Sequence, residues 1–430
     1  MRAIVAILLV GALSCSKDTP DPLDENQHVL VNDLNRIIRP IAGSELTNPD
    51  SELAPLDPAA NATVVGLGEA THGSKEFFQM KHRVFKYLVE KHGFRAFAFE
   101  MDMAEATIFD DYVQGTNPSD LKYLMKNWMI FWTWRTSEVL DLLQWMKDYN
   151  AGKSPADKVH FYGFDCQYPK YNADFLVLRI NAIDQNLGTY IQSQLSDFKT
   201  LSALGDSTRH KTIAQQVGDV YNKISDHKND LIARGMSSYD YEVAKGLARN
   251  IVQVADVIYH SKVPDGTNYR DKYMAESAMW ISSTLQTGKK ICLWAHDYHI
   301  QSVNESGGTM GYHIKTSIGT QYQKIGFAFS NGTFNAVSNG KLTSNSLTAL
   351  PNKFSTNYLF KNASSKNFIL NLGTIGSTNS FNTWANMPKP FLSIGALWYD
   401  APDSFYGAVW LADAFDFIIY FDQVNHSVLL

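Results

Sequence analysis

The chain has 430 residues, of which 45% are hydrophobic and 19% are charged, and its formal net charge is −5. This composition is typical of a globular protein and excludes a chain that is disordered throughout. No tract rich in Lys and Arg is present, so we expect no nucleic-acid partner. The length suits one large domain or two of ordinary size.

The first residues have the features of a bacterial export signal. Arg2 supplies a positive end, and the apolar run 3–13 is shorter than the roughly 20 residues that a membrane span needs. Cys15 follows, and the segment resembles a lipoprotein signal in which Cys15 is lipidated and anchors the protein to a membrane face. Ala12 departs from that pattern, because a larger aliphatic residue is usual there. We therefore expect an exported lipoprotein, on the periplasmic face or the cell surface, with a soluble secreted or periplasmic protein as the alternative.

In the first half of the chain, short apolar runs predict buried strands, and apolar residues at helical spacing predict helices between them. The predicted strands are 64–68, 96–99 and 159–164, and the predicted helices are 77–89, 104–112 and 138–149. Alternating strands and helices favour a parallel sheet.

The middle of the chain, residues 172–286, has little strand signal and contains the amphipathic patterns 239–259 and 274–285. We expect a helical insertion or cap here. Strand-like runs then resume, at 291–295, 325–329, 368–372 and 417–421. The stretches 339–346 and 373–382 are rich in Ser, Asn and Gly and predict loops.

Together these patterns predict an α/β fold with a mostly parallel central sheet flanked by helices. Residues 62–171 and 287–430 form its expected catalytic core, interrupted by the insertion at 172–286. A signal peptide, residues 1–15, and a linker with a helix, residues 16–61, precede the core.

Reactive side chains follow four of the predicted strands. They are Glu69 and His72 after the first, Glu100 after the second, Asp165 after the third, and His296 and His299 after the fourth. In open parallel sheets ligands bind beyond the carboxyl ends of the strands, so we expect these side chains to meet in one cleft.

Each of these residues also has a structural interpretation. Glu69 could cap the helix that follows it, and Glu100 could pair with Arg95 or Arg135. Asp165 could be a turn residue and His72 a satisfied buried histidine. Only the coincidence of several such side chains at one sheet edge favours a site.

Five ordered motifs carry a more specific resemblance. They are GLGEATHG at 66–73, FRAFAFE at 94–100, YGFD at 162–165, RDKYMAE at 270–276 and WAHDYH at 294–299. In order and spacing the chain resembles the erythromycin esterase family from about residue 62 to residue 330, while its tail matches loosely. The resemblance implies hydrolysis of the ester bond in a macrolide lactone, and hence macrolide resistance.

The resemblance also assigns roles to residues. It implies that His72 is the main general base and that Glu69, Glu100, His296 and His299 share its active site. The family tends to carry an arginine nine residues after that histidine, where this chain has Lys81, which keeps the charge but loses the planar fork of a guanidinium.

We expect the substrate to contact Lys81, Asp165, Trp132 and Trp134. Trp132 and Trp134 belong to an aromatic cluster with Trp128 and Phe131, which could line a wide apolar cleft or be ordinary core.

The expected mechanism is attack by water that His72 activates, with His296 or His299 stabilising the oxyanion or protonating the leaving alkoxide. No Gly-x-Ser-x-Gly motif is present, so no serine nucleophile is needed. We expect no cofactor. One alternative is a zinc-dependent hydrolase of another ester or amide substrate, with the zinc held by His72, His296, His299 and a carboxylate. Another is a haem-binding surface lipoprotein.

Two cysteines remain besides Cys15. Cys166 and Cys292 each lie beside an apolar run, and we favour two buried free thiols over a disulfide between them.

Overall fold

The computed structural model describes residues 23–202, 207–261, 264–304 and 307–430. Cys15 and the rest of the expected signal peptide lie outside the described residues. Among the residues that are described, no helix is long and apolar enough to cross a membrane.

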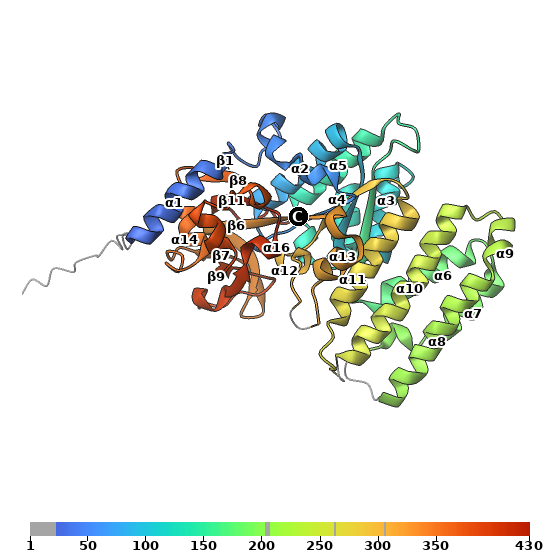
Figure 1. The fold of residues 1–430 in the computed structure, drawn as a ribbon. Coiled ribbons are helices and arrows are strands. Elements are labelled where there is room, and N and C mark those ends of the chain that lie inside the picture. Colours follow the sequence, from blue (N-terminus) through green and yellow to red (C-terminus); the bar gives the residue numbers. More distant parts are fainter. Residues whose placement is uncertain (1–22, 203–206, 262–263, 305–306) are drawn as a thin grey trace, which may run out of the picture.

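A nine-stranded sheet forms the centre of the described chain (Figure 1). The strand order is β1-β8-β11-β6-β2-β5-β3-β4, with β7 paired to β6. The strands are β1 (Arg39–Pro40), β2 (Val64–Leu67), β3 (Phe94–Asp102), β4 (His160–Asp165), β5 (Lys290–Trp294), β6 (Tyr322–Ser338), β7 (Lys341–Leu347), β8 (Asn367–Asn371) and β11 (Phe417–Val424). A separate antiparallel pair joins β9 (Pro388–Leu392) to β10 (Tyr406–Trp410).

All pairings from β11 across to β4 are parallel, whereas β1, β7 and β8 pair in the antiparallel direction. This confirms the predicted mostly parallel sheet. Because β2, β5, β3 and β4 are consecutive neighbours in the sheet, their carboxyl ends lie along one edge.

Apolar side chains alternate between the two faces of this sheet, as the twofold repeat of a strand requires. Phe97 and Phe99 belong to one buried cluster, whereas Ala96 and Ala98 belong to the other. Helices cover both faces. They are α1 (Glu25–Ile37), α2 (Lys75–His92), α3 (Met103–Gln114), α4 (Leu121–Trp128), α5 (Ser137–Asn150), α11 (Tyr269–Trp280), α12 (Asp297–Ile300), α13 (Met310–Ile318), α14 (Thr356–Lys361), α15 (Ser380–Ala385) and α16 (Leu411–Ala414).

A group of helices that follows β4 in the chain and precedes β5 projects to the right in Figure 1 and has a hydrophobic core of its own. These helices are α6 (Pro169–Asn181), α7 (Gln185–Gln194), α8 (Ser207–Asp226), α9 (Lys228–Ala233) and α10 (Ser238–His260). We call them the insertion. Their own buried cluster explains why this part of the sequence shows helical periodicity without strand signal.

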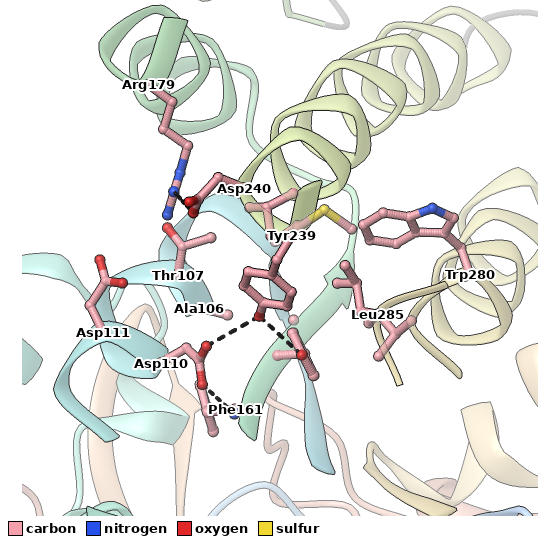
Figure 2. Close-up of a pocket in the computed structure, with 15 residues that line it drawn as sticks. Ala106, Thr107, Asp110, Asp111, Phe161, Arg179, Tyr239, Asp240, Trp280 and Leu285 are labelled. Atoms are coloured by element: carbon pink, nitrogen blue, oxygen red, sulfur yellow. Dashed lines mark hydrogen bonds and ion pairs between the residues drawn. The ribbon is translucent and has the colours of Figure 1, made fainter. Parts of the chain in front are cut away.

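The insertion meets the core along a seam in which a small pocket of about 40 Å³ lies (Figure 2). The hydroxyl of Tyr239, at the start of α10, donates to Oδ2 of Asp110 on α3 at 3.4 Å. Oδ1 of Asp110 accepts the backbone N–H of Phe161 in the edge strand β4 at 2.9 Å. This carboxylate therefore joins the edge of the sheet to the insertion.

The predicted loop at 339–346 was wrong, because β7 occupies most of it. Asn339 and Gly340 both have positive φ angles, 50° and 73°, and join β6 to β7 with Ser338 opposite Lys341. Asn-Gly is the preferred sequence of such a tight hairpin turn. The sequence did not indicate β7 as a strand, because its residues are mostly polar and exposed and show no apolar alternation.

Cys166 and Cys292 are buried free thiols that belong to different core clusters.

Candidate active site

The turn after β2 is clamped between two neighbouring elements. A Cβ atom at Gly68 would overlap Oδ1 of Asp297, and one at Gly73 would overlap the backbone of Asn335 in β6. The backbone N–H of Asp297 also donates to the carbonyl oxygen of Glu69 at 2.9 Å. Glycine at both positions therefore permits the close approach that places His72 beside the end of β5.

His72 is oriented by Glu69. Its Nδ1 lies 2.6 Å from Oε1 of Glu69, and its side chain keeps 16% of its surface exposed. The other oxygen of Glu69, Oε2, accepts from Nζ of Lys81 at 2.6 Å and from Nε1 of Trp294 at 2.7 Å. Nε2 of His72 has no hydrogen-bond partner among the described residues, and His72 lines a cleft. The protein therefore holds one ring nitrogen and leaves the other to the cleft.

Charge compensation keeps Glu69 ionised although it is completely buried. Burial acts to raise the pKa of Glu69, but Lys81 and His72 outweigh it and the pKa lies below its ordinary value. Burial lowers the pKa of Lys81 to about 8 against the opposing effect of Glu69. Nζ of Lys81 also lies 4.2 Å from the centroid of a Trp294 ring, a cation–π contact.

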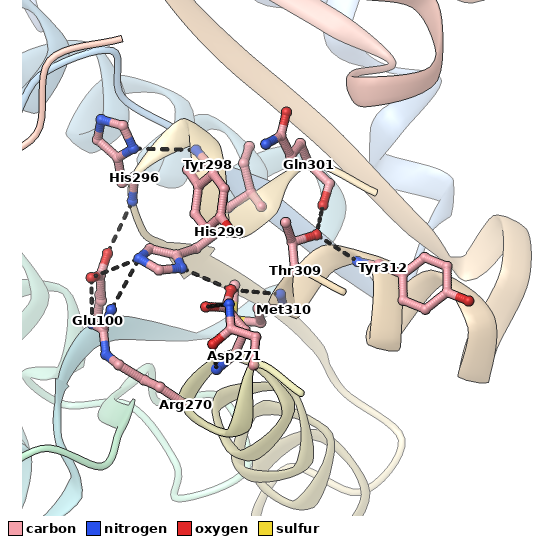
Figure 3. A network of polar contacts seen from close by, with 12 residues as sticks. Glu100, Arg270, Asp271, His296, Tyr298, His299, Gln301, Thr309, Met310 and Tyr312 are labelled. Carbon is pink, nitrogen blue, oxygen red and sulfur yellow. Dashed lines mark hydrogen bonds and ion pairs between the residues drawn. The ribbon is translucent and has the colours of Figure 1, made fainter. Parts of the chain in front are cut away.

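A second group of charges gathers around Arg270, the second residue of α11 (Figure 3). Its guanidinium binds Asp165 at the end of β4 through two hydrogen bonds, from Nε and Nη2, each 2.9 Å long. Nη2 also donates to Oε1 of Glu100 at 2.6 Å. Arg270 keeps 24% of its side chain exposed, so it remains accessible while two carboxylates hold it.

His299, on α12, lies between two carboxylates (Figure 3). Its Nδ1 is 2.8 Å from Oδ1 of Asp271, and its Nε2 is 3.3 Å from Oε1 of Glu100. Burial acts to lower the pKa of His299, but Glu100 and Asp271 outweigh burial and raise it to about 9. The pKa of Glu100 is held well below its ordinary value, since His299 and Arg270 overcome the opposing effect of burial. The raised pKa favours the cationic form of His299, and Nη1 of Arg270 also lies 3.1 Å from its Nε2.

His296 is held as a neutral imidazole. Its Nδ1 accepts the backbone N–H of Tyr298 at 3.2 Å, and its Nε2 lies 3.2 Å from the carbonyl oxygen of Ile394. A carbonyl only accepts, so Nε2 carries the proton. Burial, with His72 nearby, lowers the pKa of His296 to about 3. Its ring centroid lies 5.0 Å from that of His72, and its backbone N–H donates to Oε2 of Glu100 at 3.0 Å.

These groups open into a cleft of about 230 Å³. Its lining residues are His72, Glu100, Phe131, Trp132, Thr133, Trp134, Gln167, Arg270, His299 and Ala396. The lining thus combines charged side chains, which we call the charged wall, with the segment 131–134, which we call the aromatic wall.

The structure brings most of the predicted site residues to this cleft. His72, Glu100, His299, Trp132 and Trp134 line it. Three others lie behind the lining: Glu69 and Lys81 are completely buried, and Asp165 binds Arg270. His296 is buried between His72 and Glu100. Trp128 packs against Tyr171 and Phe175 instead.

Sequence reasoning did not select Arg270 and Asp271 as site residues, although they form one of the five motifs. The arginine partner of Glu100 is Arg270 rather than Arg95 or Arg135, which were considered. Arg270 precedes the predicted helix 274–285 and follows no predicted strand, so its position gave no reason to choose it. The signal that could have found it is the lone arginine beside an aspartate at a predicted helix start.

Comparison with known proteins finds relatives that match most of the chain. A family model described as erythromycin esterase matches residues 89–424. Erythromycin esterase type II of Escherichia coli is 24% identical over 435 residues, which cover 89% of this chain and 96% of that protein. A putative hydrolase of Bacillus subtilis (strain 168), YbfO, is 26% identical over 307 residues, which cover 64% of this chain and 67% of that protein.

Three solved structures share the fold. A Bacillus cereus protein superposes with a TM-score of 0.83 at 24% identity, covering 95% of this chain and 100% of its own. A succinoglycan biosynthesis protein gives 0.82 at 24% identity with the same coverage. A mutant of the erythromycin esterase EreC in its open conformation gives 0.68 at 19% identity, covering 91% of this chain and 99% of its own. On the family match, which spans most of its length, the chain belongs to the erythromycin esterase family of hydrolases.

Proposed function

We propose that this protein hydrolyses the ester bond of a macrolide lactone with water activated by His72, and so confers macrolide resistance. One observation carries the proposal: Glu69 binds Nδ1 of His72, which lines the cleft, while Nε2 has no protein partner among the described residues. An imidazole held in this way offers a lone pair at a chosen place, which is what a general base needs.

In the proposed reaction, Nε2 of His72 takes a proton from water as the water oxygen bonds to the ester carbonyl carbon. Glu69 stabilises the imidazolium that forms, as a buried carboxylate does in other histidine-dependent hydrolases. The tetrahedral intermediate then collapses, the bond to the ring oxygen breaks, and the leaving alkoxide takes the proton from His72. The net change is the addition of one water.

Negative charge that develops on the carbonyl oxygen needs a fixed cation nearby. Arg270 and His299 line the same cleft as His72, and the carboxylates behind them hold both in place. We assign oxyanion stabilisation to Arg270, because it keeps exposed surface, and to cationic His299. His296 cannot supply it, since both of its ring nitrogens are bound to the backbone.

A zinc ion fits this arrangement poorly. Among the described residues, no group of three or more His, Cys, Asp or Glu side chains is placed to hold a metal. Of the three imidazoles, His296 and His299 have both ring nitrogens engaged by protein groups. A catalytic zinc needs three protein ligands, and His72 offers one free nitrogen. A chelator is therefore expected to leave turnover unchanged.

The test is incubation of the purified protein with fourteen-, fifteen- and sixteen-membered macrolides, followed by mass spectrometry. We expect a product heavier by one water, and a loss of at least about 10³-fold in kcat in His72→Ala. His92→Ala is the matched control, because His92 lies at the far end of α2, the helix that follows His72, and pairs with Asp57. No mass gain with any macrolide would overturn the substrate, and full activity of His72→Ala would overturn the mechanism.

A further inference from the structure

The aromatic wall of the cleft is an irregular segment. Residues 129–134 belong to the connection between α4 and α5 and contain one short helical turn, Trp132–Trp134. Four of these six residues, 131–134, line the cleft. Within the segment, Trp134 packs against Phe99 and Trp294, with ring centroids 5.0 Å and 5.5 Å away. A wall without regular structure depends on such side-chain anchors for its position.

One further anchor comes from α3. The backbone N–H of Ile130 donates to Oε1 of Glu105 at 2.9 Å. Glu105 follows Glu100 by five residues, across the junction of β3 and α3. This hydrogen bond therefore links the aromatic wall directly to the strand that carries the carboxylate bound to Arg270 and His299.

The environment of Glu105 is unusual for an acidic side chain. It is almost completely buried, at 1% exposure, and its Oε2 has no hydrogen-bond partner among the described residues. Burial, with Asp102 and Asp165 nearby, raises the pKa of Glu105 well above its ordinary value. The raised pKa favours the protonated acid, whose carbonyl oxygen accepts from Ile130. A buried acid with one oxygen unsatisfied is retained at a cost to stability, which calls for a role.

We propose that Glu105 is a positioning residue that sets the distance between the aromatic wall and the charged wall of the cleft. It acts through the backbone of Ile130 and does not itself line the cleft. This inference rests on the proposed function, because it takes the cleft as the place where substrate binds. A bound substrate touches the wall in its ground state and in its transition state, so Glu105 governs KM more than kcat.

Two substitutions separate the hydrogen bond from the charge. Glu105→Gln keeps a neutral side chain with a carbonyl acceptor, whereas Glu105→Leu keeps the volume but leaves the Ile130 N–H unpaired. We expect Glu105→Gln to keep KM for the hydrolysed macrolide within about twofold. We expect Glu105→Leu to raise KM by about tenfold, the effect of one unsatisfied buried donor, with kcat changed by less than about threefold.

Hydrogen exchange supplies a readout that needs no turnover. The amide of Ile130 should exchange faster in Glu105→Leu and at the wild-type rate in Glu105→Gln. Asp110→Ala is the matched control, because Asp110 lies on the same helix and also accepts a backbone N–H, that of Phe161, but at the insertion seam (Figure 2). It should leave both KM and exchange at Ile130 unchanged.

Three results would overturn the proposal: unchanged KM and exchange in Glu105→Leu, equal impairment in Glu105→Gln, or an equal effect of Asp110→Ala. If Glu105→Leu does not fold, Glu105→Asp, which draws the acceptor back by one methylene, should show the same faster exchange. If the wild-type protein hydrolyses no macrolide, the proposed function fails, while exchange at Ile130 still decides whether Glu105 holds the wall.

Discussion

At the scale of single residues, Lys81 has a different role from the one its position in the sequence suggested. We expected a substrate contact, but Lys81 does not line the cleft and its ammonium group binds Glu69 in complete burial. The flexible stem and compact charge of lysine suit this contact with one carboxylate oxygen. Lys81 therefore acts on substrate only through the pair of Glu69 and His72.

This placement predicts the effect of removing the charge. Lys81→Met should lower the free energy of unfolding by about 3 kcal/mol, because it leaves the buried carboxylate of Glu69 without its counter-charge. Adding Glu69→Gln should restore much of the loss, since the charge is then absent as well. Denaturant unfolding of the two single variants and the double variant measures this coupling, with Lys81→Arg as the control that keeps the charge. Additive losses in the double variant would contradict the pairing.

His299 predicts how the enzyme responds to pH. Its pKa of about 9 lies above the ordinary value of 6.5, so its cation is present at neutral pH and is lost as pH rises through about 9. We expect kcat/KM to fall above that pH, because the oxyanion then loses one of its cations. In His299→Gln, kcat/KM should be lower than in the wild type at neutral pH, and it should show no further fall near pH 9. The free energy of unfolding depends on pH in the same direction. The contribution of His299 to it is complete below about pH 6.5 and disappears as pH rises through about 9.

At the scale of elements, the turn between β2 and α2 depends on the absence of a side chain. The carbonyl oxygen of Gly73 accepts the backbone N–H groups of Asn335 and Ser427, at 3.1 Å and 2.8 Å. These bonds tie the turn to β6 and to the C-terminal segment. The space that would hold a Cβ atom is filled by backbone, which cannot rotate away as a side chain can.

Gly73→Ala should therefore lower the free energy of unfolding by about 1–3 kcal/mol, the usual effect of overpacking. It should also lower kcat, since His72 is the preceding residue. Gly218→Ala is the control: Gly218 lies in α8 with open space around it, so alanine should stabilise the protein by about 0.5–1 kcal/mol. Thermal and denaturant unfolding check both. A Gly73→Ala protein with wild-type stability and activity would show that the turn can relax.

At the scale of the whole molecule, the insertion is bound to the carboxyl ends of the strands that carry the site. Nδ2 of Asn172, in α6, donates to Oδ1 of Asp102 at 2.7 Å. Nδ2 of Asn250, in α10, donates to the carbonyl oxygen of Asp165 at 3.0 Å. The side chain of Asp165 in turn holds Arg270. The insertion and the charged wall of the cleft therefore share the ends of β3 and β4 as a common support.

Much of this architecture could be predicted from the sequence, because it follows from local patterns. Apolar runs of strand length and apolar residues at helical spacing are local, and they predicted the parallel sheet and the helices around it. The ends of parallel strands share one edge of a sheet. Reactive residues after those strands, such as His72, Glu100 and His299, could therefore be expected in one cleft before any contact was known.

What the sequence could not determine was decided by contacts between distant residues. Glu100 and Arg270 are 170 positions apart, and no periodicity shows which of several arginines meets a given carboxylate. The same holds for the three imidazoles. His72 keeps one nitrogen free, His296 is neutral and His299 is cationic only because different long-range partners surround each ring. The sequence by itself determined which reactive groups come to the sheet edge; tertiary packing alone decided their protonation and roles, because these depend on burial and neighbouring charge.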